Sequence, residues 1–203
     1  MRAVGVDGCR GGWVAVGLAD GRFEEPRVFR TFAEVLEEYD DAGAIGVDIP
    51  IGCPLQGSRE ADEAARAFLP PARRRSVFPT PPRETLLAPT YAAARSLHPW
   101  LSTQSFALRQ RILEVEGLAD QRVYEVHPEV SFFARAGRLL PSKHTTEGIV
   151  EREAVLGIRG DTDALDAAAA AWSADRIVRG RARTLPGTPS LDPVSGRPVA
   201  IWY

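Results

Sequence analysis

The chain has 203 residues, of which 44% are hydrophobic and 26% are charged. This composition is typical of a globular protein and excludes a disordered or fibrous chain. The length supports one sizeable core and is short for two full domains, so we expect a single domain over residues 1–203. The formal net charge of −2 excludes a broadly basic binder of nucleic acid, so any such contact must be local.

The chain carries no segment suited to a membrane. Its longest weakly polar run, from Ala164 to Ala174, contains Asp166 and is too short to cross a bilayer. The N-terminus enters a strand pattern directly, without the pattern of a signal sequence. A cytoplasmic location without a membrane partner is therefore expected. Cys9 and Cys53 lack the number and spacing of a disulfide framework or a zinc site, and we expect two thiols.

The first fifty residues predict an antiparallel meander followed by a helix and a fourth strand. The pair Asp20-Gly21 is a strong hairpin signal. Apolar residues recur at helical spacing after Thr31, which can cap that helix. The predicted segments are strands at Ala3–Val6, Trp13–Leu18 and Arg27–Arg30, a helix from Thr31 to about Gly43, and a strand at Ala44–Ile49 that Pro50 stops.

The remaining residues predict mostly helices and one further strand, Arg122–Val126. Residues 70–89 are rich in proline and arginine without an apolar period, which predicts a long ordered loop inserted at about 70–90. The predicted helices are a segment capped by Ser58 that ends near Phe68, then Tyr91–Leu97, Ser105–Glu114, Glu129–Ala136, Thr145–Leu156 and Thr162–Arg179.

Together these elements predict an α/β fold with a mixed five-stranded sheet and helices on both faces. Strands one to three are expected to form the antiparallel meander and the later strands to run parallel. This order is that of the ribonuclease-H-like fold, and it also fits other α/β proteins.

Two aspartates stand at the ends of apolar strands. Asp7 follows Val4-Gly5-Val6, and Asp48 follows Ile45-Gly46-Val47. Strands disfavour aspartate, and a buried carboxylate needs compensation. If the two strands are neighbours, both carboxylates reach one sheet edge, where a divalent cation is the usual compensation. The alternative for each is a turn-forming aspartate that accepts a hydrogen bond from its own backbone.

A third acidic motif lies in the predicted last helix. Asp163 and Asp166 are three residues apart, so their carboxylates lie on one helix face. The attraction of acids to a helix N-terminus is enough to explain Asp163. Asp166 lies one turn further in, before an alanine run that suits close packing on the sheet, and this explanation does not cover it. Asp7, Asp48, Asp163 and Asp166 are therefore the candidate catalytic and metal-binding residues.

Three further residues are candidates near these acids. Glu125 and His127 share a face of the predicted fifth strand, so one of them can reach the acids if the strand ends there. A histidine beside a proline is more often structural than a ligand. Lys143, next to His144, can hold a phosphate at the start of the following helix, or lie in a solvated turn.

Arginines supply the remaining candidate substrate-binding residues. Arg74 and Arg75 lie in the proline-rich stretch with Phe78, where they can grip a nucleic-acid backbone while the ring stacks on a base. A solvated loop explains this stretch equally well. Arg10, in the turn after Asp7, is a further candidate. Lys143 is the only lysine among 25 lysine and arginine residues, and codon or genome bias is the simplest reason for the arginine excess.

The chain resembles the bacterial domain-of-unknown-function family 429, whose members are described as predicted RNase-H-like nucleases. The matching motifs extend over nearly the whole chain. They are Gly5-Val6-Asp7-Gly8-Cys9-Arg10-Gly11-Gly12-Trp13, Val47-Asp48-Ile49-Pro50-Ile51-Gly52, Arg74-Arg75-Ser76-Val77-Phe78-Pro79-Thr80-Pro81, Tyr124-Glu125-Val126-His127-Pro128-Glu129 and Ile201-Trp202-Tyr203.

A more distant similarity is to Holliday-junction resolvases of the RNase-H-like type. These proteins carry a first-strand aspartate followed by glycine, an acid on the fourth strand, and two aspartates three apart in a final helix rich in alanine. Four residues match those positions in the same order, although the fourth-strand acid of the resolvases is a glutamate. The matching residues are Asp7, Asp48, Asp163 and Asp166.

This resemblance implies hydrolysis of nucleic-acid phosphodiesters, with DNA or RNA undecided, by a two-metal-ion mechanism. Two Mg²⁺ or Mn²⁺ ions are implied, bridged by Asp7. Glu125 or Glu129 would be an outer partner of the metal ligands, and Lys143 would lie near the scissile phosphate. A junction-type substrate would further imply a symmetric homodimer.

Three other functions compete with a nuclease. Actin-like and sugar kinases share this fold and begin with a phosphate loop similar to Asp7-Gly8-Cys9-Arg10-Gly11-Gly12, but they bind ATP between two such domains. A noncatalytic metal- or nucleic-acid-binding module would keep the acids for structure. A thiol enzyme would use Cys9 or Cys53 with His127.

Overall fold

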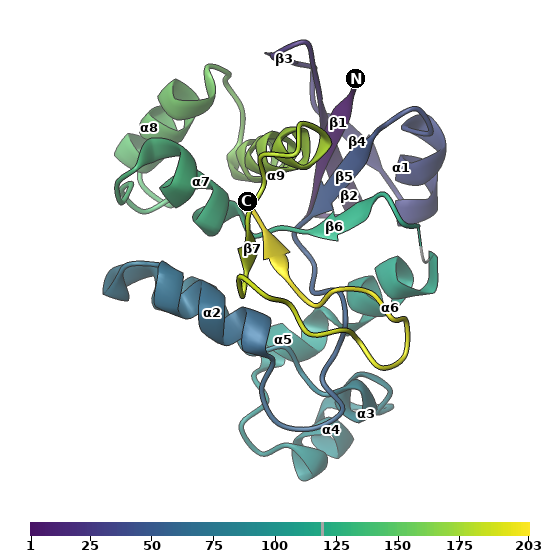
Figure 1. Cartoon of the computed structure of the whole chain (residues 1–203). Coiled ribbons are helices and arrows are strands. Elements are labelled where there is room, and N and C mark those ends of the chain that lie inside the picture. The colour runs from purple at the N-terminus through teal and green to yellow at the C-terminus, as the bar shows by residue number, and fades with distance from the viewer. Residues whose placement is uncertain (119) are drawn as a thin grey trace. The chain divides into compact units, whose positions relative to one another are not determined.

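A computed structural model of the chain describes residues 1–118 and 120–203 (Figure 1). The described backbone forms two compact units. Unit 1 comprises Met1–Ile49, Asp120–Arg183 and Trp202–Tyr203, and unit 2 comprises residues 50–118 and Thr184–Ile201. Sequence reasoning treated the chain as one domain with a loop insertion at about 70–90. Those residues belong to unit 2.

Unit 1 is built on a mixed sheet with the strand order β3-β2-β1-β5-β6, and β4 also pairs with β2. The β1–β2 pair is antiparallel, whereas β1–β5 and β5–β6 are parallel. The predicted mixed α/β sheet is therefore confirmed. The strands are β1 (Ala3–Cys9), β2 (Gly12–Ala19), β3 (Arg22–Phe23), β4 (Arg27–Phe29), β5 (Ala44–Val47) and β6 (Val123–Glu125).

The predicted third strand, Arg27–Arg30, corresponds to β4, and the expected count of five strands is wrong because the described residues add a sixth strand, β3, to this sheet. After the turn at Asp20 and Gly21, both of which have positive φ, the chain pairs with β2 for only two residues as β3. Pro26 then prevents further strand pairing, since proline has no N–H for a ladder bond. The chain resumes as β4, which pairs with the other end of β2.

Helices cover both faces of this sheet. Trp13 on β2 contacts Phe32 of α1 at 5.2 Å between ring centroids. Its neighbour Val14 points to the opposite face, since side chains alternate along a strand, and there it packs with α7, α8 and α9. The unit 1 helices are α1 (Phe32–Glu38), α7 (Pro128–Ala136), α8 (Thr146–Leu156) and α9 (Thr162–Val178).

The ends of these helices follow local capping rules. Thr31 forms a capping box with Glu34 at the start of α1. The side chains of Thr145 and Asp161 accept backbone N–H bonds at the starts of α8 and α9. The helix predicted from Thr162 is confirmed, and its alanines from Ala167 to Ala171 are all buried.

Unit 2 is mostly helical. Residues 70–89 do not form a loop throughout, because they contain η1 and α3. Pro70 and Pro82 precede these two helices with φ of −55° and −57°, and proline preorganises the chain for a helix start. The elements of this part of the chain are α2 (Glu60–Phe68), η1 (Pro71–Ser76), α3 (Arg83–Leu86), α4 (Tyr91–Leu97), α5 (Thr103–Ala107), α6 (Arg109–Leu118) and β7 (Thr184–Leu185). The strand β8 (Ile201–Trp202), which pairs with β7, begins in unit 2 at Ile201 and ends in unit 1 at Trp202.

Two helix predictions in unit 2 need correction. The single helix expected over Ser105–Glu114 is divided at Leu108 into α5 and α6. Ser58 does not cap α2, since its hydroxyl donates to the Glu63 carboxylate. The N-cap residue is Arg59, whose buried guanidinium donates to Asp62 over 2.6 Å.

The chain's two cysteines form no disulfide with each other. Among the described residues, no helix is both long enough and apolar enough to cross a membrane.

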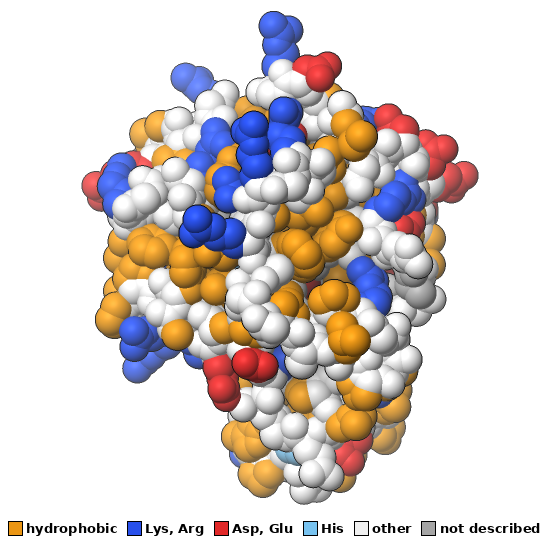
Figure 2. Space-filling model, in the orientation of Figure 1, with side chains coloured by type: hydrophobic (Ala, Val, Ile, Leu, Met, Phe, Trp, Pro, Cys, Tyr) orange, Lys and Arg blue, Asp and Glu red, His pale blue; other side chains and the backbone are white. Residues whose placement is uncertain are grey.

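Charge is unevenly spread on the face shown in Figure 2. Acidic side chains gather over α1, and lysine and arginine side chains gather over α9. Arg179, Arg181 and Arg183 are exposed at and beyond the C-terminal end of α9, where cations are favoured by the helix dipole. Helix electrostatics are therefore a sufficient explanation for these three exposed arginines.

Candidate functional site

The parallel pairing of β1 and β5 brings Asp7 and Asp48 to one edge of the unit 1 sheet. Val6 is the register partner of Val47, so the two aspartates follow side by side. The Asp48 backbone N–H donates to the Val6 carbonyl over 3.0 Å, which extends this pairing past the end of β5. Asp7 Oδ1 accepts a 2.7 Å bond from the Gly8 backbone N–H. Both aspartates are partly buried.

Asp166 reaches the same region from the second turn of α9, and only 2% of its surface is exposed. Burial raises the pKa of Asp7 to about 8, and the charges of Asp48 and Asp166 add to this effect. Burial and the Asp166 charge likewise raise the pKa of Asp48 to about 8. Three carboxylates from distant parts of the sequence therefore lie within electrostatic reach of one another and oppose one another's ionisation.

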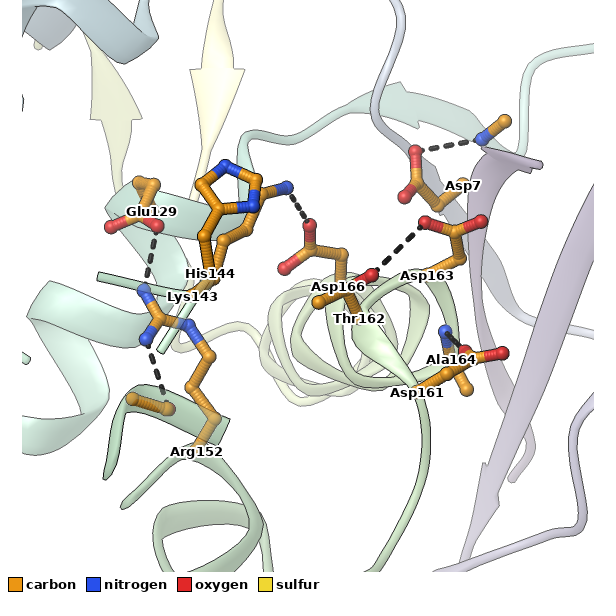
Figure 3. Close-up of polar contacts among 12 residues, drawn as sticks. Asp7, Glu129, Lys143, His144, Arg152, Asp161, Thr162, Asp163, Ala164 and Asp166 are labelled. Carbon is orange, nitrogen blue, oxygen red and sulfur yellow. Dashed lines mark hydrogen bonds and ion pairs between the residues drawn. The ribbon is translucent and has the colours of Figure 1, made fainter. Parts of the chain in front are cut away.

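Lys143 supplies positive charge to this acidic cluster. Its Nζ donates to Asp166 Oδ2 over 2.5 Å, and 35% of its side chain remains exposed (Figure 3). Burial disfavours the ammonium, but Asp166, Asp7 and Asp48 outweigh that effect and raise the pKa of Lys143. The pKa of Asp166 is raised by burial, and Lys143 opposes this rise. Lys143 is therefore a protonated cation and is unsuited to act as an amine nucleophile.

Asp163 lies one turn before Asp166 on α9 and is partly buried. Figure 3 shows its carboxylate on the side of the helix toward Asp7, whereas Asp166 points toward Lys143. Asp163 Oδ1 accepts a long bond of 3.5 Å from the Thr162 hydroxyl. Its N-terminal position in α9 suits a negative charge whether or not it takes part in chemistry.

Glu125 and Glu129 bring further negative charge near Asp48, and both raise its pKa. Glu125 is buried and is the register partner of Val47, so strand alternation points it away from the face that α9 covers. Glu129, in the first turn of α7, forms an ion pair with Arg152, with 2.7 Å between Glu129 Oε1 and Arg152 Nη2.

The other predicted substrate-binding residues are spread over the chain. His127 is the N-cap residue of α7 and is partly buried. Its backbone carbonyl accepts a hydrogen bond from the Ser131 hydroxyl over 3.2 Å. Arg10 is exposed in the turn between β1 and β2. Arg74 and Arg75 are exposed residues of η1 in unit 2, and Arg74 donates to the Leu69 carbonyl over 3.3 Å.

Sequence reasoning missed Arg152, which is 1% exposed and has the largest buried polar side chain of unit 1. Helical spacing contains a signal for it. Gly148, Arg152 and Leu156 are four residues apart and all buried, so they share the inner face of α8. A charged residue on such a face needs a buried partner.

The donors of this site fit a hard divalent cation, because carboxylate oxygens are the preferred ligands of Mg²⁺ and Mn²⁺. Burial and the neighbouring carboxylates raise the pKa of Asp7 and of Asp48, and a cation beside them would favour their ionised forms. Within residues 1–118 and 120–203, no three His, Cys, Asp or Glu side chains are already grouped to hold a metal ion. Ion binding would therefore require Asp7, Asp48 and Asp166 to turn toward a shared position.

A comparison with known protein families matches residues 5–191 to the family described as "Protein of unknown function (DUF429)". The match spans both units and includes Asp7, Asp48, Lys143 and Asp166. The chain belongs to the DUF429 family. No curated protein and no solved structure matches it. The acidic cluster described above is therefore a site within the matched region of a DUF429 protein, and its chemistry must be argued from its own residues.

Proposed function

We propose that this chain is a divalent-metal-dependent nuclease that hydrolyses phosphodiester bonds in nucleic acid. The observation that carries the proposal is the convergence of Asp7, Asp48 and Asp166. Asp7 lies in β1, Asp48 directly follows β5 and Asp166 lies in α9, and the charge of each carboxylate opposes the ionisation of its neighbours. Burying carboxylates close together costs free energy unless their charge is compensated. A bound cation would supply that compensation.

The sheet supports a ribonuclease-H-like fold as the finer description of unit 1. An antiparallel meander precedes two parallel strands, and β1 lies centrally between β2 and β5. This is the arrangement that the resemblance to RNase-H-like proteins implies. The closing helix α9 then brings its acidic N-terminal turns to the edge where β1 and β5 end.

In this proposal Asp7, Asp48 and Asp166 would hold Mg²⁺ or Mn²⁺, with Asp163 as a further ligand. Two bound ions would supply activation of a water and stabilisation of the leaving oxygen. Lys143 is well placed to contact a phosphate, because its cation lies beside Asp166 and is partly exposed. It can offset negative charge that develops on the phosphate during hydrolysis.

The test is cleavage of labelled single-stranded, double-stranded and branched DNA, and of RNA, by the purified chain with Mn²⁺. We expect cleavage of at least one substrate and its loss with EDTA. Asp7→Asn should abolish cleavage without altering the circular dichroism spectrum. Asp161→Asn is the matched control, because Asp161 is an exposed cap residue of α9 and asparagine caps a helix equally well.

Other outcomes of this experiment would contradict the proposal. Cleavage that survives Asp7→Asn would come from a contaminant or another site. Absence of cleavage combined with ATP hydrolysis or thermal stabilisation by ATP would favour an actin-like phosphotransferase. Thermal stabilisation by Mn²⁺ without any cleavage would favour a noncatalytic metal-binding module.

A further inference from the structure

Arg152 of α8 connects three segments around the acidic cluster from a fully buried position. Its Nη1 donates to the carbonyls of Pro141 and Gly148 over 2.7 and 3.1 Å, and its Nη2 donates to Glu129 Oε1 over 2.7 Å. Its guanidinium carbon lies 5.0 Å from the centroid of the Phe132 ring. The contact with Glu129 is visible in Figure 3.

We propose that Arg152 is a positioning residue that fixes Lys143 beside Asp166. The link is short, since the Pro141 carbonyl that accepts from Arg152 lies only two residues before Lys143. Arg152 thus ties the start of the lysine-bearing loop to α8 and, through Glu129, to α7. This proposal rests on the proposed function for the role of Lys143 toward a phosphate, but the placement of Lys143 can be tested without any activity.

The rest of the loop is attached to the first turn of α8. The Thr145 hydroxyl donates to the Ser142 carbonyl over 2.8 Å and accepts the Gly148 N–H over 3.1 Å. A Cβ on Gly148 would lie 1.9 Å from the Ser142 carbonyl oxygen, so only glycine allows this approach. Lys143 therefore lies between two anchored segments, of which the Pro141 side depends on Arg152.

Arginine suits this position better than lysine would. A guanidinium carries five donors in a fixed plane, so one group can bond two carbonyls and a carboxylate together. The ion pair also compensates Glu129, whose negative charge otherwise disfavours ionised Asp48 and Asp166. Arg152 thus acts on the site through geometry at Pro141 and through charge at Glu129, and the two effects can be separated by mutation.

The test uses the fact that Lys143 is the only lysine of the chain. Protein made with ¹³C- and ¹⁵N-labelled lysine gives NMR signals from Lys143 alone. In the natural chain we expect two resolved Hε signals and a rigid Cε, as for a side chain held in one position. In Arg152→Met the two signals should merge at the position of free lysine, and the relaxation of Cε should become that of a mobile side chain.

Two variants separate geometry from charge and guard against loss of folding. Arg152→Met/Glu129→Gln removes both charges and leaves no unpaired buried ion, yet the Pro141 bond is still lost, so the Lys143 signals should again merge. Glu129→Gln alone keeps the guanidinium and should leave them resolved. Arg138→Met is the matched control, because the exposed Arg138 forms an ion pair with Glu151, the α8 residue next to Arg152.

A cleavage assay then connects placement to activity. Arg152→Met/Glu129→Gln should lower kcat by roughly 10- to 100-fold, as loss of an outer-shell contact does. In a Lys143→Met background the same double change should cost no further activity, because it removes the Glu129 charge together with the guanidinium, and the remaining effect of Arg152, through the Pro141 bond, acts on Lys143.

The positioning role is overturned by resolved, rigid Lys143 signals in a folded double variant. It is also overturned by unfolding of both Arg152 variants, since Arg152 would then stabilise the whole unit and not this loop. Merged signals in a protein that cleaves no nucleic acid would keep the positioning role and reject the nuclease proposal.

Discussion

Gly5 and Gly46 are register partners in the parallel pair of β1 and β5, and α9 packs directly on both of them. A Cβ on Gly5 would lie 1.9 Å from the Ala167 carbonyl oxygen, and a Cβ on Gly46 would lie 2.9 Å from the Ala170 carbonyl oxygen. These two glycines allow the backbone of α9 to touch the sheet. That close contact brings Asp166, one residue before Ala167, to the strand ends that carry Asp7 and Asp48.

Gly5→Ala should therefore destabilise the protein strongly. The added methyl group meets helix backbone, which cannot rotate away as a side chain can, so we expect a loss of about 3 kcal/mol or more in the free energy of unfolding. Urea denaturation measures this loss. Gly117→Ala in α6 is the control, because its Cβ meets nothing within 4 Å and alanine favours a helix. Equal stability of Gly5→Ala and the natural chain would contradict the close packing of α9.

Asp48→Asn should make the melting temperature less dependent on pH. The pKa of Asp48 rises from about 3.9 in an unfolded chain to about 8 in the folded chain. The folded state thus holds this proton more tightly, and stability falls as the pH rises from about 4 to about 8. Asparagine has no such proton to lose. In metal-free buffer the melting temperature of the variant, relative to that of the natural chain, should increase as the pH rises from about 4 to about 8. At higher pH this difference should stay constant. Parallel melting curves at every pH would contradict the shift.

Lys143→Met should lower kcat for phosphodiester cleavage by about 100-fold, as loss of a charge-stabilising group does. Lys143→Arg should recover part of the activity, since the positive charge returns with a different shape. His144→Ala is the control, because His144 is the exposed neighbour of Lys143. Full activity of Lys143→Met would remove this residue from the proposed chemistry.

Asp62→Ala should destabilise unit 2. Asp62 is buried and accepts bonds from the Arg59 guanidinium and from the backbone N–H and hydroxyl of Thr80. Its removal leaves a buried guanidinium with less compensation, which costs about 3–5 kcal/mol. Limited proteolysis should reveal faster cutting within residues 50–118. Exposed Glu60, on the same helix, provides the control Glu60→Ala, and equal cutting rates in the two variants would oppose this account.

The acidic cluster could be predicted because local sequence rules apply to each of its members. Asp7 and Asp48 end apolar strands, and Asp166 lies before a run of alanines, so each residue is unusual in its own segment. Parallel strands end at a common edge, which is enough to bring Asp7 and Asp48 together. The mixed sheet could be predicted for the same reason, since its strands and helices carry clear periodicities.

The contacts of Lys143 and Arg152 could not be predicted in this way. Lys143 lies 23 residues from Asp166, and Arg152 lies 23 residues from Glu129, so only tertiary packing joins them. The short elements of residues 70–89 were also missed, because prolines that start η1 and α3 read as loop residues in a single sequence. The additional strand β3 was missed because it is only two residues long and depends on pairing with the end of β2 opposite to the one that pairs with β4, which no local pattern records.

The most direct test of the central claim is calorimetric titration of the metal-free chain with Mn²⁺ at pH 8, where the crowded carboxylates can ionise. Our account predicts saturable binding that is lost in Asp7→Asn and in Asp48→Asn but retained in Asp161→Asn. Equal Mn²⁺ affinity in all four proteins, or no binding by the natural chain, would contradict a shared cation site at Asp7, Asp48 and Asp166.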